Sequence, residues 1–324
     1  MEWKNVTRTK KAGATLVRIL AALLLLCIGN VLAAGQPDAG ESVTDNKYES
    51  RFLLDPDQGL PRQLEEAKRV KVAADAGDAL AQYLLGTLYR LGKSHPARVF
   101  ERDDDIAAKY LSNAAINGEV FAMAGMAELE LRRKRLPQAR LWAQVFARYE
   151  AVYVAAIGGN PNPNRHQAYA AFLIGRIDPL PGRADATEKQ LREDFFVFLQ
   201  NYDTQIRAAF ATLKHPSQSA NNKGQEELRW SGTFQMDLPM PIMREHGIDS
   251  PGEAIYLGGV NAKGRIEKLL VIDSLPDQIV AGGLAASLAR RSHFNTAKVD
   301  TPLRWARIPM SYDDQTVELK KSGK

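Results

Sequence analysis

The feature that most constrains the fold of this chain is an internal repeat. The segment AADAGDALAQYLLGTLY, which begins at Ala73, recurs 41 residues later as AAINGEVFAMAGMAELE, which begins at Ala114. In both copies a glycine separates two stretches in which small and apolar residues recur at helical spacing. A helix, turn and helix that repeat at this period predict an α-solenoid, in which each copy buries its apolar face against the next.

Further matches extend the predicted array. The segment DIAAKYLSNAA aligns with PQARLWAQVFA, and AYAAFLIGRI is a third copy of the first helix, with Gly175 in the place of Gly86. The array therefore has two or three repeats. A long amphipathic helix is predicted from about Asp185 to Lys214, and its apolar face would close the end of the array. The predicted solenoid spans residues 61–214.

Small residues in the first copy have a physical role. Gly86 would let a neighbouring helix approach closely, and Gly77 would supply the left-handed conformation at the end of a helix. The segment AADAGDALAQYLLGTLYRLG resembles the Sel-one-like repeat, a relative of the tetratricopeptide repeat, and in the second copy Ala127 stands where that family has glycine. The resemblance implies a helical scaffold whose concave face holds a protein or peptide.

The N-terminal segment is predicted to be a secretory signal. Basic residues precede the apolar run ILAALLLLCIG, and small residues follow it in NVLAAG, which is the order of a cleavable signal peptide. The apolar run is short for a membrane span, so residues 1–34 are assigned to the signal, with cleavage after Ala33 or Ala34. Residues 35–60, rich in Gly, Pro and Asp, are assigned to a mobile leader.

Charge and cysteine content narrow the function classes. The chain carries 43 Lys or Arg and 38 Asp or Glu, a formal net charge of +5. The predicted signal holds most of this excess, and the other charges are interspersed, so no nucleic-acid partner is expected. The single cysteine, Cys27, also lies in the signal, and Leu26 stands where a bacterial lipobox has a small residue. We therefore expect no lipid anchor, no disulfide and no thiolate chemistry.

The C-terminal third changes character. The composition of HPSQSANNKGQE indicates a linker over residues 215–238. The segment EAIYLGGVNAKGRIEKLLVID then predicts two strands joined at NAKG, where Asn261 opens the turn and Gly264 supplies a positive φ. Ser274 is predicted to cap a following helix, and PLRWARIPMSY alternates as a third strand, which Pro309 places partly at a sheet edge.

This ββαβ order, preceded by a helical stretch at PIMREHGI, resembles the carboxy-terminal domain of TonB over residues 239–312. Residues 313–324 are left as a polar tail. The matching positions are Pro241, Gly247, Gly264, Leu284, Phe294 and Ala297. Thr296 departs from the family's proline, and DSPGE lengthens the approach to the first strand. The resemblance implies a domain that binds short peptide segments by adding them as strands at a sheet edge, although the same fold also serves other roles.

The predicted fold class is therefore α+β in several domains, an N-terminal α-solenoid followed by a small ββαβ domain similar to that of TonB. Both parts are types that bind other proteins.

No catalytic, cofactor-binding or metal-binding constellation is recognised in the sequence. The five histidines are His95, His166, His215, His246 and His293. No pair of them has the spacing that places two imidazoles on one helix face, so they are interpreted as surface or capping residues. Three acidic residues, Asp103, Asp104 and Asp105, are interpreted as cap and dipole partners of the helix that follows them.

The last strand offers the most interesting exposed candidates for partner contact. These are Arg304, Trp305 and Arg307. Alternation would point Arg304 and Trp305 to opposite faces of the strand, and a tryptophan in such a place is more often part of a core.

Three functions can be compared on these features. The first is a non-catalytic periplasmic protein of the cell envelope that binds protein or peptide partners through the solenoid and the terminal sheet, with no cofactor and no small-molecule substrate. The second is a TonB-like energy transducer held in the inner membrane by an uncleaved N-terminus, which would also need a long extended spacer. The third is an enzyme. The first is the hypothesis that the sequence favours.

Overall fold

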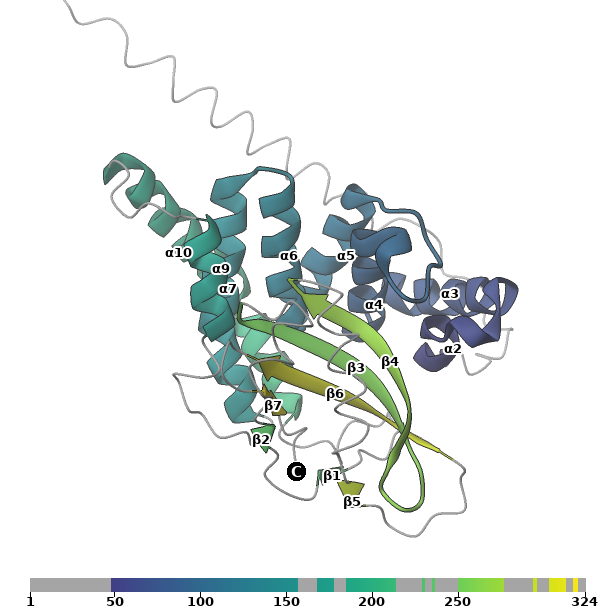
Figure 1. Ribbon diagram of the computed structural model, residues 1–324. Coiled ribbons are helices and arrows are strands. Elements are labelled where there is room, and N and C mark those ends of the chain that lie inside the picture. The colour runs from purple at the N-terminus through teal and green to yellow at the C-terminus, as the bar shows by residue number, and fades with distance from the viewer. Residues whose placement is uncertain are drawn as a thin grey trace, which may run out of the picture. The chain divides into compact units, whose positions relative to one another are not determined.

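A computed structural model describes residues 48–156, 168–177, 185–213, 229–230, 235–236, 250–276, 294–295, 303–312 and 317–319. The chain divides into two units after Asp45, and all of the described residues belong to the second unit, Asn46–Lys324. Within this unit a series of helices precedes an antiparallel sheet (Figure 1). The α+β class predicted from the sequence is thereby confirmed.

The helices, in chain order, are α2 (Ser50–Leu54), the 3-10 helix η1 (Pro56–Gln58), α3 (Leu60–Asp75), α4 (Ala79–Leu91), the 3-10 helix η2 (Gly92–Ser94), α5 (Asp104–Ile116), α6 (Val120–Arg132), α7 (Leu136–Ala156), α9 (Ala168–Ile177) and α10 (Asp185–Leu213). The strands are β1 (Arg229–Trp230), β2 (Gln235–Met236), β3 (Gly252–Val260), β4 (Ile266–Leu275), β5 (Phe294–Asn295), β6 (Arg304–Tyr312) and β7 (Val317–Leu319).

The turns inside the repeats follow the sequence prediction. Gly77, between α3 and α4, has a φ of 98°, and Gly118, between α5 and α6, has a φ of 89°. Asp78 then begins α4 as its N-cap, because its carboxylate accepts a hydrogen bond from the backbone N–H of Ala81 at 2.7 Å. The alternation of helix and glycine turn in the sequence is therefore an alternation in the structure.

Each helix from α3 to α7 packs on the one before it. A Cβ atom added at Gly86 would lie 2.7 Å from the Leu111 side chain, so this glycine does permit the close approach of α4 and α5. Gly175 in α9 has no atom within 4 Å of such a Cβ, so it has no equivalent role. The long helix α10 buries Ile206 and Phe210 and packs on both α7 and α5.

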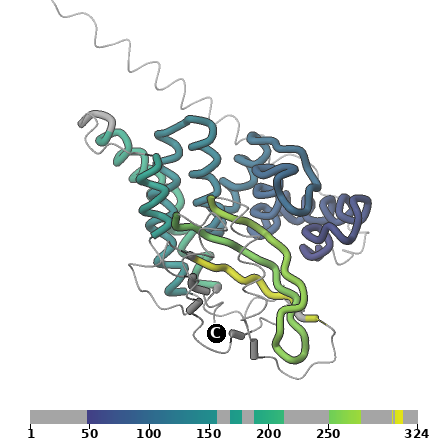
Figure 2. The backbone as a smooth tube through the Cα atoms, in the orientation of Figure 1, coloured from purple at the N-terminus to yellow at the C-terminus, as the bar shows by residue number. Residues whose placement is uncertain are grey.

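The larger sheet has the strand order β2-β7-β6-β3-β4, and the neighbouring strands are antiparallel. Figure 2 shows its long strands β3, β4 and β6 side by side. Strand β3 is paired along both of its edges, with β4 on one side and with β6 on the other. The turn between β3 and β4 is the predicted one, since Gly264 has a φ of 76° and the Asn261 side-chain oxygen accepts from the N–H of Lys263 at 2.9 Å.

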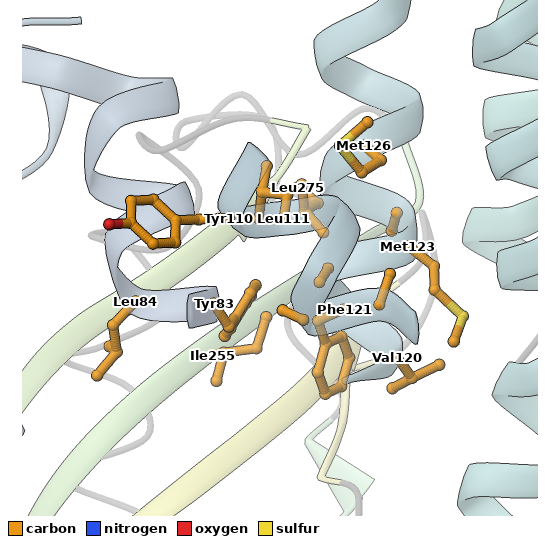
Figure 3. Packing of buried hydrophobic residues seen from close by; sticks show 14 of the residues in the cluster. Tyr83, Leu84, Tyr110, Leu111, Val120, Phe121, Met123, Met126, Ile255 and Leu275 are labelled. Atoms are coloured by element: carbon orange, nitrogen blue, oxygen red, sulfur yellow. The ribbon is translucent and has the colours of Figure 1, made fainter. Parts of the chain in front are cut away.

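Helices and sheet share a single hydrophobic core. The buried cluster includes Tyr83 and Phe121 from the helices as well as Ile255 and Leu275 from β3 and β4 (Figure 3). Among the described helices, α2, α4 and α6 contact β4, and α9 contacts β3. The sequence aligns α4, α6 and α9 as copies of one repeat helix, and in the structure α4 contacts α6 and α6 contacts α9, so the three helices form a row.

Ordered structure begins earlier than predicted. Residues 50–58, assigned to a mobile leader, form α2 and η1. Leu53 and Leu54 are fully buried in the common core, and this burial is the physical reason for the correction.

Segments that were assigned to connections also form strands. β2, in the predicted linker (residues 215–238), and β7, in the predicted tail (residues 313–324), belong to the larger sheet, whereas β1, also in the linker, pairs with β5 in a separate two-stranded sheet. Because β7 pairs with β6 only at Met310–Tyr312, the position of Pro309 partly at an edge agrees with the described pairing.

One capping prediction was wrong. Ser274 is a buried residue of β4 and does not begin a helix. Strand β4 continues past the expected boundary because its last residues pair with β3 as far as Leu275. The helix expected after it lies outside the described residues.

Candidate functional site

The feature of most chemical interest is a group of charged side chains buried between the helices and the sheet. It begins with an irregularity in β4. The pairing of β3 with β4 shifts between Ile255, which faces Asp273, and Tyr256, which faces Val271, so that Ile272 is an extra residue. A bulge of this kind reverses the alternation of the residues after it. Asp273 therefore lies on the sheet face that Ile255 presents to the helices.

The Asp273 carboxylate is fully buried and surrounded by donors from α4. Tyr83 donates its hydroxyl hydrogen to Oδ2 at 2.7 Å, and Arg90 donates from Nη2 to Oδ1 at 2.5 Å. Thr87 lies 3.3 Å from Oδ2, and the backbone N–H of Ser274 donates to Oδ1 at 2.7 Å. The spacing of Tyr83, Thr87 and Arg90 at three and four residues places all three on one face of α4.

Burial and charge act in opposite directions on this group. Burial raises the pKa of Asp273 above its ordinary value, although Arg90 and the hydrogen bond from Tyr83 favour the ionised form. Burial lowers the pKa of Arg90, but Asp273, Tyr83, Glu128 and Tyr169 together outweigh burial, with Asp273 the largest of the four, so that the pKa of Arg90 is raised. Burial and the Asp273 charge raise the pKa of Tyr83 well above its ordinary value, which keeps the phenol protonated as a donor. Asp273 and Arg90 therefore form a buried ion pair, and Tyr83 donates a hydrogen bond to its carboxylate.

His95 is part of the same interface, and the surface position expected for it was wrong, although the residue does form the C-cap of η2. The side chain is fully buried; Nδ1 accepts from the N–H of Ala97 at 3.1 Å, and Nε2 lies 3.2 Å from the carbonyl oxygen of Ile272. Since Nδ1 accepts, Nε2 carries the hydrogen and donates it to β4. Burial, assisted by the Arg90 charge, lowers the pKa of His95 to about 4.

A second ion pair joins the sheet to the start of α6. Arg307 in β6 donates from both terminal nitrogens to the Glu119 carboxylate, at 2.6 and 2.8 Å. Its guanidinium also lies 5.3 Å from the ring centres of both Tyr83 and Phe121. Burial lowers the pKa of Arg307, but the charge and hydrogen bonds of Glu119, together with Tyr153 and Tyr83, outweigh burial and raise that pKa. The expectation of an exposed Arg307 was wrong, because its strand face lies against the helices.

A third ion pair lies at the other end of the interface. Lys268 in β4 donates to Asp55 at 2.6 Å and to Asp57 at 3.0 Å. Both acceptors belong to the segment that was predicted to be a leader, so this contact adds to the burial of α2 as a reason for its order. Across the three ion pairs, the helices and the sheet each contribute both positive and negative groups. Such a mixed pattern is complementary in one position of the sheet on the helices, and it therefore fixes that position.

The other candidates have plainer roles. Trp305 is partly buried and packs against the common core, and Arg304 begins β6 with its side chain outside the described part. Asp103 caps α5 by accepting from the N–H groups of Asp105 and Ile106, as predicted. Asp104 pairs with Arg132 at 2.6 Å. The histidines at positions 166, 215, 246 and 293 lie outside the described residues.

Within the described residues, no group of His, Cys, Asp or Glu side chains is arranged to hold a metal ion. The helices described are also too short or too polar to span a membrane. Comparison with known protein families, with curated proteins and with solved structures found no match to this chain.

The arrangement as a whole joins two parts of the chain. Its donors and acceptors are directed at one another, and the groups at its centre are fully buried. Sequence reasoning missed Asp273, Arg90 and Glu119. One signal was present, since Asp273 interrupts an apolar strand and Arg90 interrupts an apolar helix, and buried charges of this kind need partners.

Proposed function

We propose that this protein is a non-catalytic periplasmic protein of the cell envelope that binds protein or peptide partners, built from a Sel-one-like solenoid and a TonB-like sheet domain. Support for the solenoid comes from the repeated helix pairs and from the row formed by α4, α6 and α9. Support for the TonB-like domain comes from the antiparallel order β6-β3-β4, with the third strand beside the first.

The observation that carries the proposal is the open stretch of β6, by which we mean Arg304–Pro309, where the described residues supply a pairing strand on one side alone. This strand pairs with β3 along its whole length, from Arg304 to Tyr312. On its other side the described pairing covers Met310–Tyr312 alone. A strand with one side of its backbone unpaired can accept an extended peptide through main-chain hydrogen bonds.

The contact between sheet and helices restricts where a partner binds. The face of α4 and α6 that a solenoid would offer to a ligand is covered here by β4 and β6, through the Asp273 and Glu119 ion pairs. We therefore assign partner binding to the sheet edge and not to that helix face.

Site-specific photo-crosslinking in a Gram-negative host tests this assignment. A photoreactive amino acid at Ala306, in the open stretch of β6, is expected to give an adduct with a cell-envelope protein. The same amino acid at Glu65, an exposed position of α3, is the matched control and is expected to give none. Equal adducts at both positions, or none at Ala306, would contradict binding at this edge.

The location is tested separately, by N-terminal sequencing and membrane fractionation of the protein expressed with its own N-terminus. A soluble product that begins at Ala34 or Gly35 supports the periplasmic proposal. A membrane-bound product that keeps Met1 supports the second candidate, an anchored transducer.

A further inference from the structure

The C-terminal strand β7 lies on the same edge of β6 that the proposed function assigns to a partner. We propose that β7 is a built-in competitor, which covers one end of this edge until the strand of a protein partner displaces it. This inference rests on the proposed function, because it concerns access to the same edge.

The pairing places β7 directly in the path of a longer added strand. β7 faces β6 through the pairs Met310 with Leu319, Ser311 with Glu318, and Tyr312 with Val317. β6 itself spans Arg304–Tyr312. A partner strand that used the full length of β6 would need the backbone groups that β7 now occupies.

The geometry also makes β7 a weak and removable cover. It is 3 residues long, against 9 in β6, so it satisfies a small part of the edge. Residues 313–316 connect the two strands, the length of a hairpin loop, and this holds β7 at a high effective concentration near β6. A short strand that is tethered in this way protects an edge from unwanted pairing, yet a longer strand can replace it.

The strand on the other side of β7 fits this interpretation. β2 pairs with β7 through Gln235 with Glu318 and Met236 with Val317. A partner strand that takes the place of β7 offers β2 the same main-chain groups. The exchange therefore preserves the ladder on both sides.

The first test compares the full chain with a chain that ends at Tyr312. The probe is a fluorescently labelled synthetic peptide, DQTVELKKS, which has the sequence of residues 314–322. Because the shortened chain lacks the tethered strand, we expect it to bind the peptide at least about tenfold more tightly than the full chain, as measured by fluorescence anisotropy. Equal binding by the two chains, or binding by neither, would overturn the proposal.

A second variant keeps the tail and does not depend on the folding of the shortened chain. Tyr312→Cys with Val317→Cys, made in a Cys27→Ser background, places two cysteines at directly opposite positions, which a disulfide can bridge. The oxidised form is expected to lose peptide binding, and reduction is expected to restore the level of the full chain. Unchanged binding on oxidation would overturn the proposal, and each single cysteine variant is the control.

Photo-crosslinking at Ala306 in the same double variant separates this inference from the proposed function. Capture of a cell-envelope protein by the reduced form and not by the oxidised form supports both. Equal capture by the two forms overturns the competition but leaves partner binding in place. If neither form captures a protein while the peptide results are as expected, the proposed function is contradicted. The inference that β7 covers the edge of β6 would then still hold.

Discussion

At the scale of single residues, the Asp273 carboxylate contributes most to joining the two parts of the chain. It is fully buried beside Arg90, which is 2% exposed. Replacing one member of a buried ion pair leaves the other charge without a partner, which is more costly than removing both. The same logic applies less strongly to Lys268, because its side chain is 33% exposed and water screens its charge.

We expect Asp273→Asn to lower the free energy of unfolding by about 3–5 kcal/mol, because it leaves the Arg90 guanidinium buried and unpaired. Urea denaturation would measure this loss. The control is Asp105→Asn, whose side chain is 94% exposed and should change stability by less than about 0.5 kcal/mol. Adding Arg90→Met to Asp273→Asn should recover part of the lost unfolding free energy. If the double variant loses as much as the single variants Asp273→Asn and Arg90→Met lose together, this account is contradicted.

His95 predicts a dependence of stability on pH. Its pKa is about 4 in the folded protein and about 6.5 when unfolded, so the unfolded chain binds more protons between these values. Stability is therefore lost as the pH falls from about 6.5 to about 4, by about 3 kcal/mol at about 1.4 kcal/mol for each pKa unit.

The measurement is the difference in unfolding free energy between the wild type and His95→Gln at pH 7 and at pH 4. Glutamine keeps a donor for the Ile272 carbonyl but does not titrate. Taking the difference also removes the contribution of Asp273, whose raised pKa has the opposite sign. If the wild type and the variant lose stability in parallel, His95 is not the group responsible.

At the scale of the elements, glycine at equivalent positions has two different roles. Gly86 meets the Leu111 side chain of the neighbouring helix, whereas Gly175 meets no atom within 4 Å. We expect Gly86→Ala to destabilise the protein by about 1–3 kcal/mol through overpacking. Gly175→Ala should be neutral or stabilise by up to about 1 kcal/mol, because alanine favours a helix. Chemical denaturation of both variants would test this, and equal effects would show that the contact with Leu111 is not decisive.

At the scale of the whole molecule, the sheet and the helices are expected to unfold together, because their buried residues form one cluster. Leu257→Pro should show this. It removes a backbone donor from β3, a strand paired along both edges, in which Leu257 faces Leu270 of β4 and Arg307 of β6. We expect loss of both the strand and the helical circular dichroism signal.

The matched control is Ala79→Pro at the first position of α4, where proline is tolerated and Asp78 is already extended. Retention of the full helical signal in Leu257→Pro, with a normal control, would mean that the helices fold without the sheet.

The sequence by itself determined the local structure. The two helix pairs α3–α4 and α5–α6, the glycines at their turns, the capping by Asp103 and the NAKG hairpin all depend on neighbours a few residues apart, and each is present as predicted. Such features follow from backbone conformation and short-range hydrogen bonds. Both depend on the type of residue at a few neighbouring positions, so the sequence pattern predicts them.

Only the tertiary structure decided how the parts combine. Arg90 and Asp273 are 183 residues apart, and the bulge at Ile272 that turns Asp273 toward α4 leaves no pattern in the sequence. The helix α2 in the predicted leader and the strand β7 in the predicted tail form for the same reason, since both gain their partners from distant segments. Burial and charge pairing depend on what lies opposite each residue in space, and a linear pattern does not specify that.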